Sequence, residues 1–306
     1  MTKSTKRLLL GLDLGGSSIK IAVIAVGVDG KPTVLAQESR DTHPSRALSK
    51  VLDDLLLITN EFREKYGACD SIGVGLPGIH DEISGVTSHL TNFSAEWEGS
   101  QFRSKLSNRL GRPITVANDG RAFSLAESVL GAGAGFETVV CVVLGTGIGG
   151  GVVIDGKLWK GRSSVGELGH QSVQFDGPLC GCGNRGCVEL FAGAAAITEA
   201  GGRETVREVF EAAASGDALA QGAVDQAISA LAAGLANTYV MLAPDLIVVG
   251  GGVAKAGAQL LDPLTAQIRE RANLVSSAQI RVVPAELGYF AGAIGAALMG
   301  AEQFAL

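Results

Sequence analysis

One short segment constrains the fold of this chain more than any other part of it. Residues 166–189 (GELGHQSVQFDGPLCGCGNRGCVE) hold three of the five cysteines and one of the four histidines. Three thiolates and one imidazole are the ligand set of a closed, tetrahedral structural zinc site, and the intervening glycines let a short loop fold around an ion. The predicted zinc ligands, spaced H-x9-C-x-C-x4-C, are His170, Cys180, Cys182 and Cys187.

Two alternatives stand beside a zinc site: the cysteines could form disulfides, or they could be reduced and without a ligand. The apolar stretch near the N-terminus is too short and too glycine-rich for a secretory signal, which disfavours disulfides. A bond between Cys180 and Cys182 would also close a very tight ring. The cysteines are expected to be purely structural, whereas His170 is also expected to contact a ligand.

Two glutamates, Glu167 and Glu189, flank the cysteine and histidine array. Four ligands already complete a zinc site, so these carboxylates are not needed by the metal. A rigid loop that presents carboxylates is suited to holding a polar ligand in fixed geometry.

Length and composition limit the class of protein. A chain of 306 residues is long for one hydrophobic core, so two domains are expected. The 43 glycines and the low aromatic content of 5% are typical of a compact α/β protein with many tight turns. The net charge of −6 gives no basic surface for nucleic acid, and no apolar run reaches the ~20 residues that span a bilayer. A cytoplasmic protein with no nucleic-acid or membrane partner is expected.

Short apolar runs bounded by glycine predict strands, and their continuous pattern is typical of strands buried on both faces. The predicted strands are residues 7–14, 19–26, 71–75, 114–117, 138–144, 150–154 and 246–249. The predicted helices are residues 46–66, 101–110, 120–130, 204–214, 218–242 and 257–271. Two α/β halves of related design fit this order better than one continuous sheet.

Three glycine-rich turns follow predicted strands, at residues 13–20, 145–151 and 250–252. Glycine lets successive backbone N–H groups approach an anion, and Asp13 beside the first turn could hold a divalent cation. Glycine more often marks an ordinary hairpin than a phosphate site, but three such turns together favour phosphate binding. None has the spacing of a P-loop or of a Rossmann fingerprint.

The pair Asn118-Asp119 follows a predicted strand and precedes a predicted helix. An aspartate at a strand end is well placed to take a proton from a hydroxyl group. The alternative is that Asp119 caps the helix that begins near Gly120. The spacing alone leaves both open.

Several motifs together resemble those of the ROK family (repressors, open reading frames and kinases). They are DLGGSSIK (13–20), GVGLPGIHD (73–81), NFSAEWEG (92–99), ANDGRAFSLAE (117–127), VVLGTGIGGGVVIDGKLWKG (142–161), GELGH (166–170), CGCGNRGCVE (180–189) and LAPDLIVVGGGV (242–253). The resemblance implies a two-lobed actin-like ATPase (ribonuclease H-like) fold, with a zinc-stapled loop in the larger lobe. Residues 1–117 and 288–306 would form the small lobe, and residues 118–287 the large one.

The resemblance also implies an ATP-dependent sugar kinase with Mg²⁺, a structural Zn²⁺ and a homodimeric state. Asp119 would be the general base. The sugar would be bound by Gly78, Asn92, Asn118, Asp119, Glu167, His170 and Glu189. The Mg²⁺–ATP would be bound by Asp13, Gly15, Gly16, Ser17, Lys20, Gly145, Thr146, Gly147, Gly251 and Gly252.

Glucose, phosphorylated to glucose 6-phosphate, is the expected substrate, but two departures from many glucokinases lie near the sugar residues. Gly120-Arg121 stands where those enzymes have Ala-Asn, and residues 93–96 (FSAE) lack the usual proline or glycine. A kinase of N-acetylmannosamine, N-acetylglucosamine or another sugar is the alternative, and polyphosphate stays open as a donor. A non-catalytic sugar-responsive regulator is a third reading. It is disfavoured because the first strand begins near Arg7, which leaves no room for a preceding DNA-binding domain.

Overall fold

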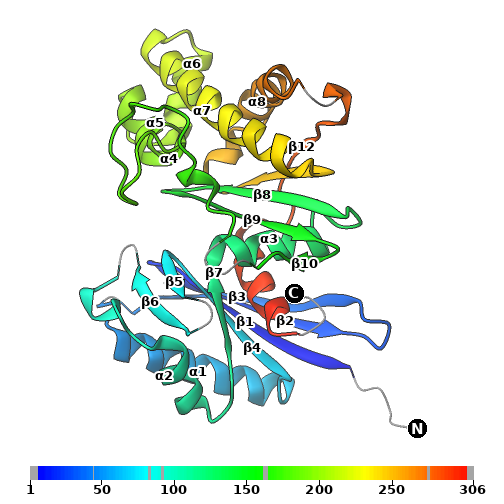
Figure 1. Ribbon diagram of the computed structural model, residues 1–306. Helices are drawn as coiled ribbons and strands as arrows, with labels where there is room; N and C mark the ends of the chain where they lie inside the picture. Colours follow the sequence, from blue (N-terminus) through cyan, green and yellow to red (C-terminus); the bar gives the residue numbers. More distant parts are fainter. Residues whose placement is uncertain are drawn as a thin grey trace. The chain divides into compact units, whose positions relative to one another are not determined.

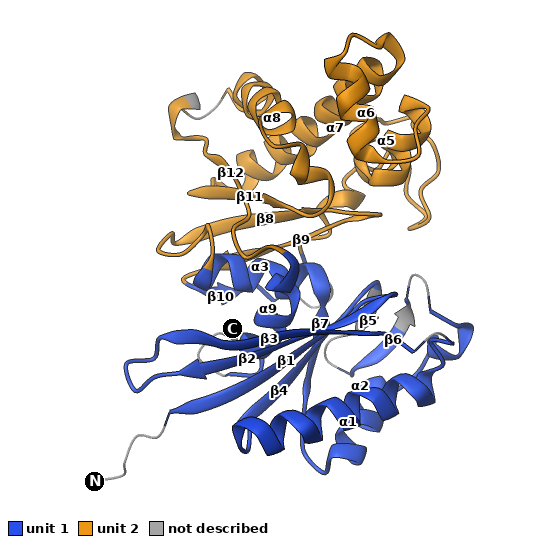
Figure 2. Ribbon diagram, turned by 180° about the vertical axis from the view of Figure 1, so that it is seen from behind, with its two compact units in different colours: residues 1–130, 156–165, 289–306 blue, residues 131–155, 166–288 orange. Residues whose placement is uncertain are grey.

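The structure, a computed structural model, describes residues 6–43, 45–81, 84–90, 93–160, 165–273 and 276–301. By packing, the chain divides into two compact units (Figure 2). Met1–Leu130, Gly156–Val165 and Tyr289–Leu306 form the first unit, and Gly131–Asp155 and Gly166–Gly288 form the second. Each unit is built around a sheet with helices packed against it (Figure 1).

The first unit is built on a five-stranded sheet of order β3-β2-β1-β4-β7. The strands β1, β2 and β3 form an antiparallel meander, while β4 and β7 continue the sheet in parallel with β1. The bounds are β1 (Arg7–Leu14), β2 (Ser18–Val26), β3 (Pro32–Asp41), β4 (Ser71–Leu76) and β7 (Thr115–Asn118), beside the small hairpin of β5 (Ile79–Asp81) and β6 (Val86–His89).

Helices cover both faces of this first sheet (Figure 1). They are α1 (Leu48–Tyr66), α2 (Phe102–Leu110), α3 (Asp119–Leu130) and α9 (Ala291–Met299), with the 3-10 turns η1 (Ala95–Trp97) and η5 (Gly288–Phe290). The short strand β10 (Lys157–Leu158) lies in the segment Gly156–Val165, which is grouped with this unit, but it belongs to the second sheet.

The alternation along β4 explains how the two faces differ. Ile72 and Val74 lie in the apolar cluster beneath α1 and α2. Gly73 lies on the other face, where a Cβ would overlap the Ala296 carbonyl oxygen of α9. A Cβ at Gly11 in β1 would likewise overlap the Ala293 carbonyl oxygen of α9. Glycine is needed at both strand positions because α9 packs directly on the strand backbone.

The helix α3 packs with the first unit. A Cβ at Gly295 of α9 would overlap the Ala122 carbonyl oxygen, so the two helix backbones are in direct contact. The sequence placed the domain boundary between residues 117 and 118, whereas packing places the division after Leu130.

The second unit repeats the same strand order. Its sheet runs β10-β9-β8-β11-β12, with β8 and β9 antiparallel and β8, β11 and β12 parallel. When the five strands of each sheet are numbered in chain order, both sheets have the spatial order third, second, first, fourth, fifth. The bounds are β8 (Thr138–Leu144), β9 (Ile148–Ile154), β11 (Leu246–Gly250) and β12 (Val282–Pro284).

Helices of the second unit bury one face of its sheet in a single apolar cluster. They are α4 (Glu189–Ala192), α5 (Ala194–Gly201), α6 (Val206–Ala214), α7 (Ala218–Leu242) and α8 (Ala258–Arg271), with η2 (Leu168–His170), η3 (Val253–Ala256) and η4 (Ser277–Gln279). Across the described residues of the chain, no helix is both long enough and apolar enough to span a bilayer.

Candidate functional site: a carboxylate pair, three glycine turns and a metal loop

Asp13 and Lys20 form an ion pair at the end of the first hairpin. Asp13 in β1 is the direct cross-strand partner of Lys20 in β2. The Lys20 Nζ donates to Asp13 Oδ2 at 3.0 Å, and only 18% and 10% of the lysine and aspartate side chains are exposed. A carboxylate this buried needs a partner because desolvation of an unpaired charge is costly. The pair therefore fixes the orientation of the Asp13 carboxylate.

Two glycines make room for the Asp13 carboxylate. Gly75 is its partner in the parallel strand β4, and a Cβ there would lie 3.5 Å from Asp13 Oδ1 and 3.8 Å from Asp119 Cα. A Cβ at Gly292, in the first turn of α9, would lie 2.6 Å from Asp13 Oδ2. Sequence reasoning assigned neither residue to the site. The available signal was the run of small residues in α9.

Asn118 is the residue that caps α3. Its Oδ1 accepts from the backbone N–H of Arg121 at 3.2 Å, which is the hydrogen bond expected of an N-cap residue. Its Nδ2 donates to the Gly78 carbonyl oxygen at 3.1 Å. Asp119 is the first residue of α3, and its Oδ1 accepts from the Gly120 N–H at 2.8 Å. The capping role that the sequence left open for Asp119 thus belongs to Asn118.

The pKa of the Asp119 carboxyl is raised from 3.8 to about 7. Desolvation by burial is the largest cause, and the negative charge of Asp13 adds to it. The Gly120 N–H and the charge of Lys20 oppose the rise. A carboxyl group that titrates near neutral pH suits general acid–base chemistry.

The first glycine turn is held by hydrogen bonds to its neighbours. The Gly15 N–H donates to the Ser18 carbonyl oxygen at 2.9 Å, and the Thr42 hydroxyl donates to the Gly15 carbonyl oxygen at 2.7 Å. The Tyr289 hydroxyl is hydrogen-bonded to the Ser18 hydroxyl at 2.8 Å. The Lys20 Nζ lies 5.0 Å from the centre of the Tyr289 ring, within cation–π distance. Tyr289 is a further residue that sequence reasoning missed.

The second glycine turn, in the second unit, is braced by a glutamate. The Gly145 N–H donates to the Gly147 carbonyl oxygen at 2.9 Å, which closes the turn. The Ile148 N–H donates to Glu189 Oε2 at 2.8 Å. Glu189, expected as a sugar ligand, therefore has one carboxylate oxygen on the backbone of this turn.

The third glycine turn lies beside the second. β11 and β8 are neighbouring parallel strands, so the turns that follow them lie at the same edge of the sheet. Gly251 has a φ of +92°, and a Cβ there would overlap the backbone of Leu144. Only glycine meets both requirements. The structure thus brings the two predicted turns of this unit together.

The GELGH segment packs on β9 through glycines. A Cβ at Gly166 would lie 2.6 Å from Gly151 Cα, and one at Gly169 would lie 2.7 Å from Ile148 Cβ. This close approach holds Glu167 and His170 beside the strand that follows the second glycine turn.

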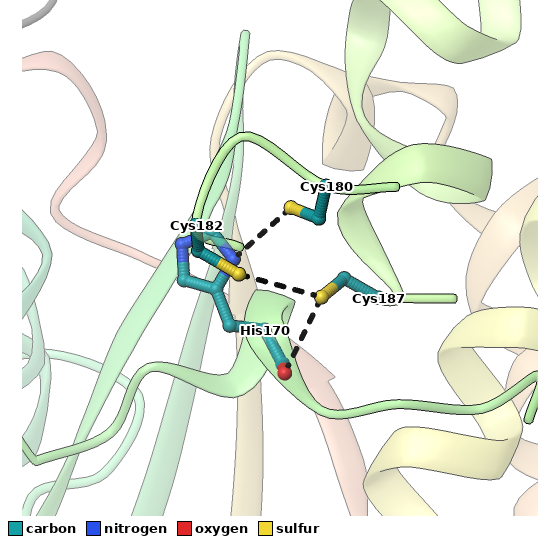
Figure 3. A group of neighbouring side chains, drawn as sticks. All are labelled: His170, Cys180, Cys182 and Cys187. Atoms are coloured by element: carbon teal, nitrogen blue, oxygen red, sulfur yellow. Dashed lines mark hydrogen bonds between the residues drawn. The ribbon is translucent and has the colours of Figure 1, made fainter. Parts of the chain in front are cut away.

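The four predicted metal ligands are brought together, with their side chains pointing toward one another (Figure 3). Their ligand atoms all lie within 4.8 Å of one another. The Cys182 and Cys187 sulfurs are 3.7 Å apart, as are the Cys180 sulfur and His170 Nδ1. Zinc–sulfur bonds of about 2.3 Å in a tetrahedron place neighbouring ligand atoms ~3.8 Å apart. The donor set and its spacing fit a zinc ion.

The three cysteines of this loop are free thiols. A hydrogen bond from the Asn184 backbone is the main cause that lowers the pKa of Cys182. Burial, together with the neighbouring Cys180 and Cys182, raises the pKa of Cys187 to about 12. Thiolates this close repel one another, and a bound cation removes that repulsion.

The predicted site residues thus fall into one group in each unit. The first group is Asp13, Gly15, Gly16, Ser17, Lys20, Gly78, Asn118 and Asp119, and the second is Gly145, Thr146, Gly147, Glu167, His170, Glu189, Gly251, Gly252 and the three loop cysteines. Asn92, a predicted sugar ligand, lies outside the described residues.

Two sheets of one strand order, with a buried carboxylate on the first and glycine turns on both, define an actin-like ATPase fold, as expected. The model of the ROK family matches residues 9–303, and the chain belongs to this family.

Curated relatives of the chain include sugar kinases of more than one kind. It is 33% identical to a glucokinase of Thermotoga maritima, covering 96% of this chain and 98% of that protein. It is 31% identical to an N-acetyl-D-glucosamine kinase of Photobacterium profundum, covering 96% of this chain and 99% of that protein.

Solved structures give the same fold. A ROK hexokinase of Thermus thermophilus matches with a TM-score of 0.85 and 34% identity, over 96% of this chain and 97% of that one. A ROK glucokinase of Streptomyces griseus, in complex with glucose and AMPPNP, matches with a TM-score of 0.76 and 30% identity, over 96% and 99%. A ROK transcriptional regulator, a homologue of the E. coli MLC protein, matches with a TM-score of 0.80 and 28% identity, over 96% and 77%.

Proposed function

We propose that this ROK family member phosphorylates glucose at its 6-hydroxyl with ATP as donor. The class of enzyme, an ATP-dependent sugar kinase, rests on its kinase relatives of nearly equal length. The single observation that carries the mechanism is the Asp119 carboxyl, with a pKa of about 7, beside the ion-paired Asp13.

Asp119 is the general base in this proposal. Its carboxylate accepts the proton of the sugar hydroxyl as that oxygen attacks the terminal phosphoryl group of ATP. A pKa of about 7 leaves a large share of the carboxyl ionised at neutral pH and still gives the carboxylate basicity. The Asn118 cap and the Gly120 N–H hold its position at the start of α3.

Asp13 is the residue proposed to hold the Mg²⁺ that accompanies ATP. A bound Mg²⁺ neutralises charge on the phosphates during transfer. Lys20 orients the Asp13 carboxylate through the 3.0 Å ion pair. The backbone N–H groups of the glycine turns are proposed to contact the phosphates and the nucleotide, as such turns do in other anion sites.

The sugar hydroxyls are proposed to be bound by Asn118, Glu167, His170 and Glu189, with Gly78 and Asn92 at the other edge of the sugar. His170 Nδ1 lies on the metal side of the ring, 3.7 Å from the Cys180 sulfur. The second ring nitrogen, Nε2, is the atom proposed for the sugar.

Zinc is proposed as the ion of the cysteine loop, held by His170 and the three cysteines. The support is the ligand set and the 3.7 Å spacings described above. The ion would tie the chain between residues 170 and 187 together and fix the direction in which Glu167 and Glu189 enter the site. A homodimer and a cytoplasmic location are proposed from the family alone.

A kinase of N-acetylglucosamine or N-acetylmannosamine is the second candidate. The supporting observation is that the N-acetyl-D-glucosamine kinase relative is about as similar as the glucokinase, at 31% against 33% identity. The Gly120-Arg121 pair beside Asp119 also departs from many glucokinases. A non-catalytic regulator like the MLC homologue is less favoured, because Asp119 retains the environment of a general base.

A steady-state assay tests the proposed substrate. ADP formation is measured with ATP and a panel of glucose, mannose, fructose, N-acetylglucosamine and N-acetylmannosamine, and polyphosphate replaces ATP in a parallel series. We expect the highest kcat/KM with glucose and ATP. A higher kcat/KM for an N-acetyl sugar would establish the second candidate, and no turnover of any sugar would contradict the proposed activity.

A further inference from the structure

Glu189 makes a contact that a sugar ligand does not require. Its Oε2 accepts the backbone N–H of Ile148 at 2.8 Å, at the end of the second glycine turn. A Cβ at Gly147 would overlap this same oxygen, so the carboxylate occupies the space that a side chain at residue 147 would fill. The carboxylate and the glycine are fitted to each other.

The backbone after Glu189 is joined to the same turn. The Ala194 N–H donates to the Gly145 carbonyl oxygen at 2.9 Å. A Cβ at Gly193 would lie 2.8 Å from the Glu189 carbonyl oxygen and 3.1 Å from the Thr146 carbonyl oxygen. The turn is therefore clasped by a side chain at the start of α4 and by a backbone hydrogen bond after its end.

The metal loop, residues 170–187 with the four candidate ligands, lies directly before Glu189 in the sequence. Cys187, a candidate ligand, is two residues before Glu189, and its carbonyl oxygen accepts the Leu190 N–H at 3.0 Å. The Val188 N–H donates to the Gln171 carbonyl oxygen at 3.0 Å, which ties this stretch to the residue after His170. A continuous chain of contacts thus runs from the metal ligands to the second glycine turn.

From these contacts we infer that Glu189 is a positioning residue for the nucleotide, because its Oε2 holds the turn of Gly145, Thr146 and Gly147 in the shape that binds phosphate. This inference rests on the proposed function, since it assumes that the turn binds the phosphates of ATP. One carboxylate oxygen holds the turn, and the other is left for a sugar hydroxyl. A single side chain then links the metal loop, the sugar and the nucleotide.

The geometry also predicts which substitutions preserve the contact. Glutamine at residue 189 keeps a side-chain oxygen that can accept the Ile148 N–H, whereas alanine removes the acceptor. Alanine at residue 147 would put a Cβ in the space of the Glu189 carboxylate and so displace that carboxylate from the turn. Gly147 has no left-handed φ, so its backbone accepts alanine and the effect falls on the carboxylate.

The test is the affinity for a non-hydrolysable ATP analogue with Mg²⁺ in the absence of sugar, measured by calorimetry on the zinc-loaded full chain. Removing a hydrogen bond to a charged group is expected to weaken binding about tenfold in Glu189→Ala. Glu189→Gln should bind the analogue within about twofold of the wild type, because its acceptor is retained. Elemental analysis of each variant confirms that zinc is retained and that the loop is folded.

Two further variants separate this role from sugar binding. Glu167→Ala removes the other flanking carboxylate and should raise only the sugar KM, with the analogue affinity unchanged. Gly147→Ala should weaken the analogue, and combining it with Glu189→Ala should add little, because both remove the same contact.

Each outcome decides a separate point. Glu189→Ala with wild-type affinity for the analogue, or Glu189→Gln as weak as Glu189→Ala, would overturn the inference. A wild-type protein that fails to bind the analogue at all would instead contradict the proposed function.

Discussion

Replacing Asp119 with asparagine separates the chemistry of this carboxyl from its cost to stability. Asparagine keeps the shape and an oxygen that can accept the Gly120 N–H, but it cannot take a proton from the sugar. Loss of a general base is expected to lower kcat roughly 10²–10⁴-fold, with the sugar KM little changed. The wild-type activity itself should fall as the pH drops below about 7, because the base must be ionised.

The same substitution is expected to stabilise the ligand-free protein above neutral pH. The folded-state pKa of about 7 lies above the ordinary value of 3.8, so ionised Asp119 destabilises the folded state. The difference between these pKa values corresponds to an upper limit of roughly 4 kcal/mol. The side chain is partly exposed, and solvent screening reduces the expected gain to the order of 1–2 kcal/mol.

The pH dependence of this destabilisation can be measured by thermal unfolding. The destabilisation is absent below the unfolded pKa, grows as the pH rises toward 7, and is constant above it. Thermal unfolding without Mg²⁺ should therefore show a higher Tm for Asp119→Asn at pH 8, by about 2–4 °C per kcal/mol. The difference should shrink toward zero near pH 4.

An exposed aspartate provides the control. Asp262→Asn, on the surface of α8, should change neither kcat nor the pH dependence of Tm. A kcat for Asp119→Asn within a few-fold of the wild type would refute the general-base role. Equal Tm differences at pH 8 and pH 4 would refute the raised pKa.

Three further predictions test the metal loop, the buried thiols and the packing around the carboxylate. Cys182→Ser should lose the zinc that elemental analysis finds at one ion per chain in the wild type, and its sugar KM should rise; a wild type that is zinc-free and fully active would contradict this. Cys69 and Cys141 are buried and form no disulfide, so a thiol reagent should leave both unmodified in the native enzyme. Rapid modification of either with loss of activity would count against a purely structural role. Gly292→Ala should lower kcat about tenfold and destabilise the protein by about 1–3 kcal/mol, because its Cβ would lie 2.6 Å from a buried carboxylate oxygen. The exposed helix position Gly222, where a Cβ meets nothing within 4 Å, is the matched control, and alanine there should stabilise the protein by about 1 kcal/mol.

Strands buried on both faces were the elements that the sequence located best. β1 and β8 have the predicted bounds, because a short, continuous apolar run next to a glycine turn is typical of a buried strand. β3 (Pro32–Asp41) was missed, since it alternates between half-buried and exposed residues at the edge of its sheet and carries no long apolar run. α4 was missed because it begins at the last residue of the metal signature, and α5 was missed because only Gly193 separates it from α4.

The candidate site shows the same division between local and long-range information. The metal ligands could be predicted because all four lie within one short segment and their residue types define the chemistry. Gly292 and Tyr289 could not be placed, because each meets the first hairpin only through the return of the chain to the first unit. The contact of Glu189 with the Ile148 N–H involves a backbone group, which leaves no signal in the side-chain pattern.

The most direct test of the central claim is the identification of the product that this chain makes from glucose and ATP. Phosphorus and proton NMR of the reaction mixture would show which sugar oxygen carries the phosphoryl group, for the wild type and for Asp119→Asn at equal enzyme concentration. Glucose 6-phosphate and ADP are expected in equal amounts from the wild type, and the variant is expected to react at a rate roughly 10²–10⁴-fold lower. ATP hydrolysis without a phosphorylated sugar, or equal rates for the two proteins, would contradict it.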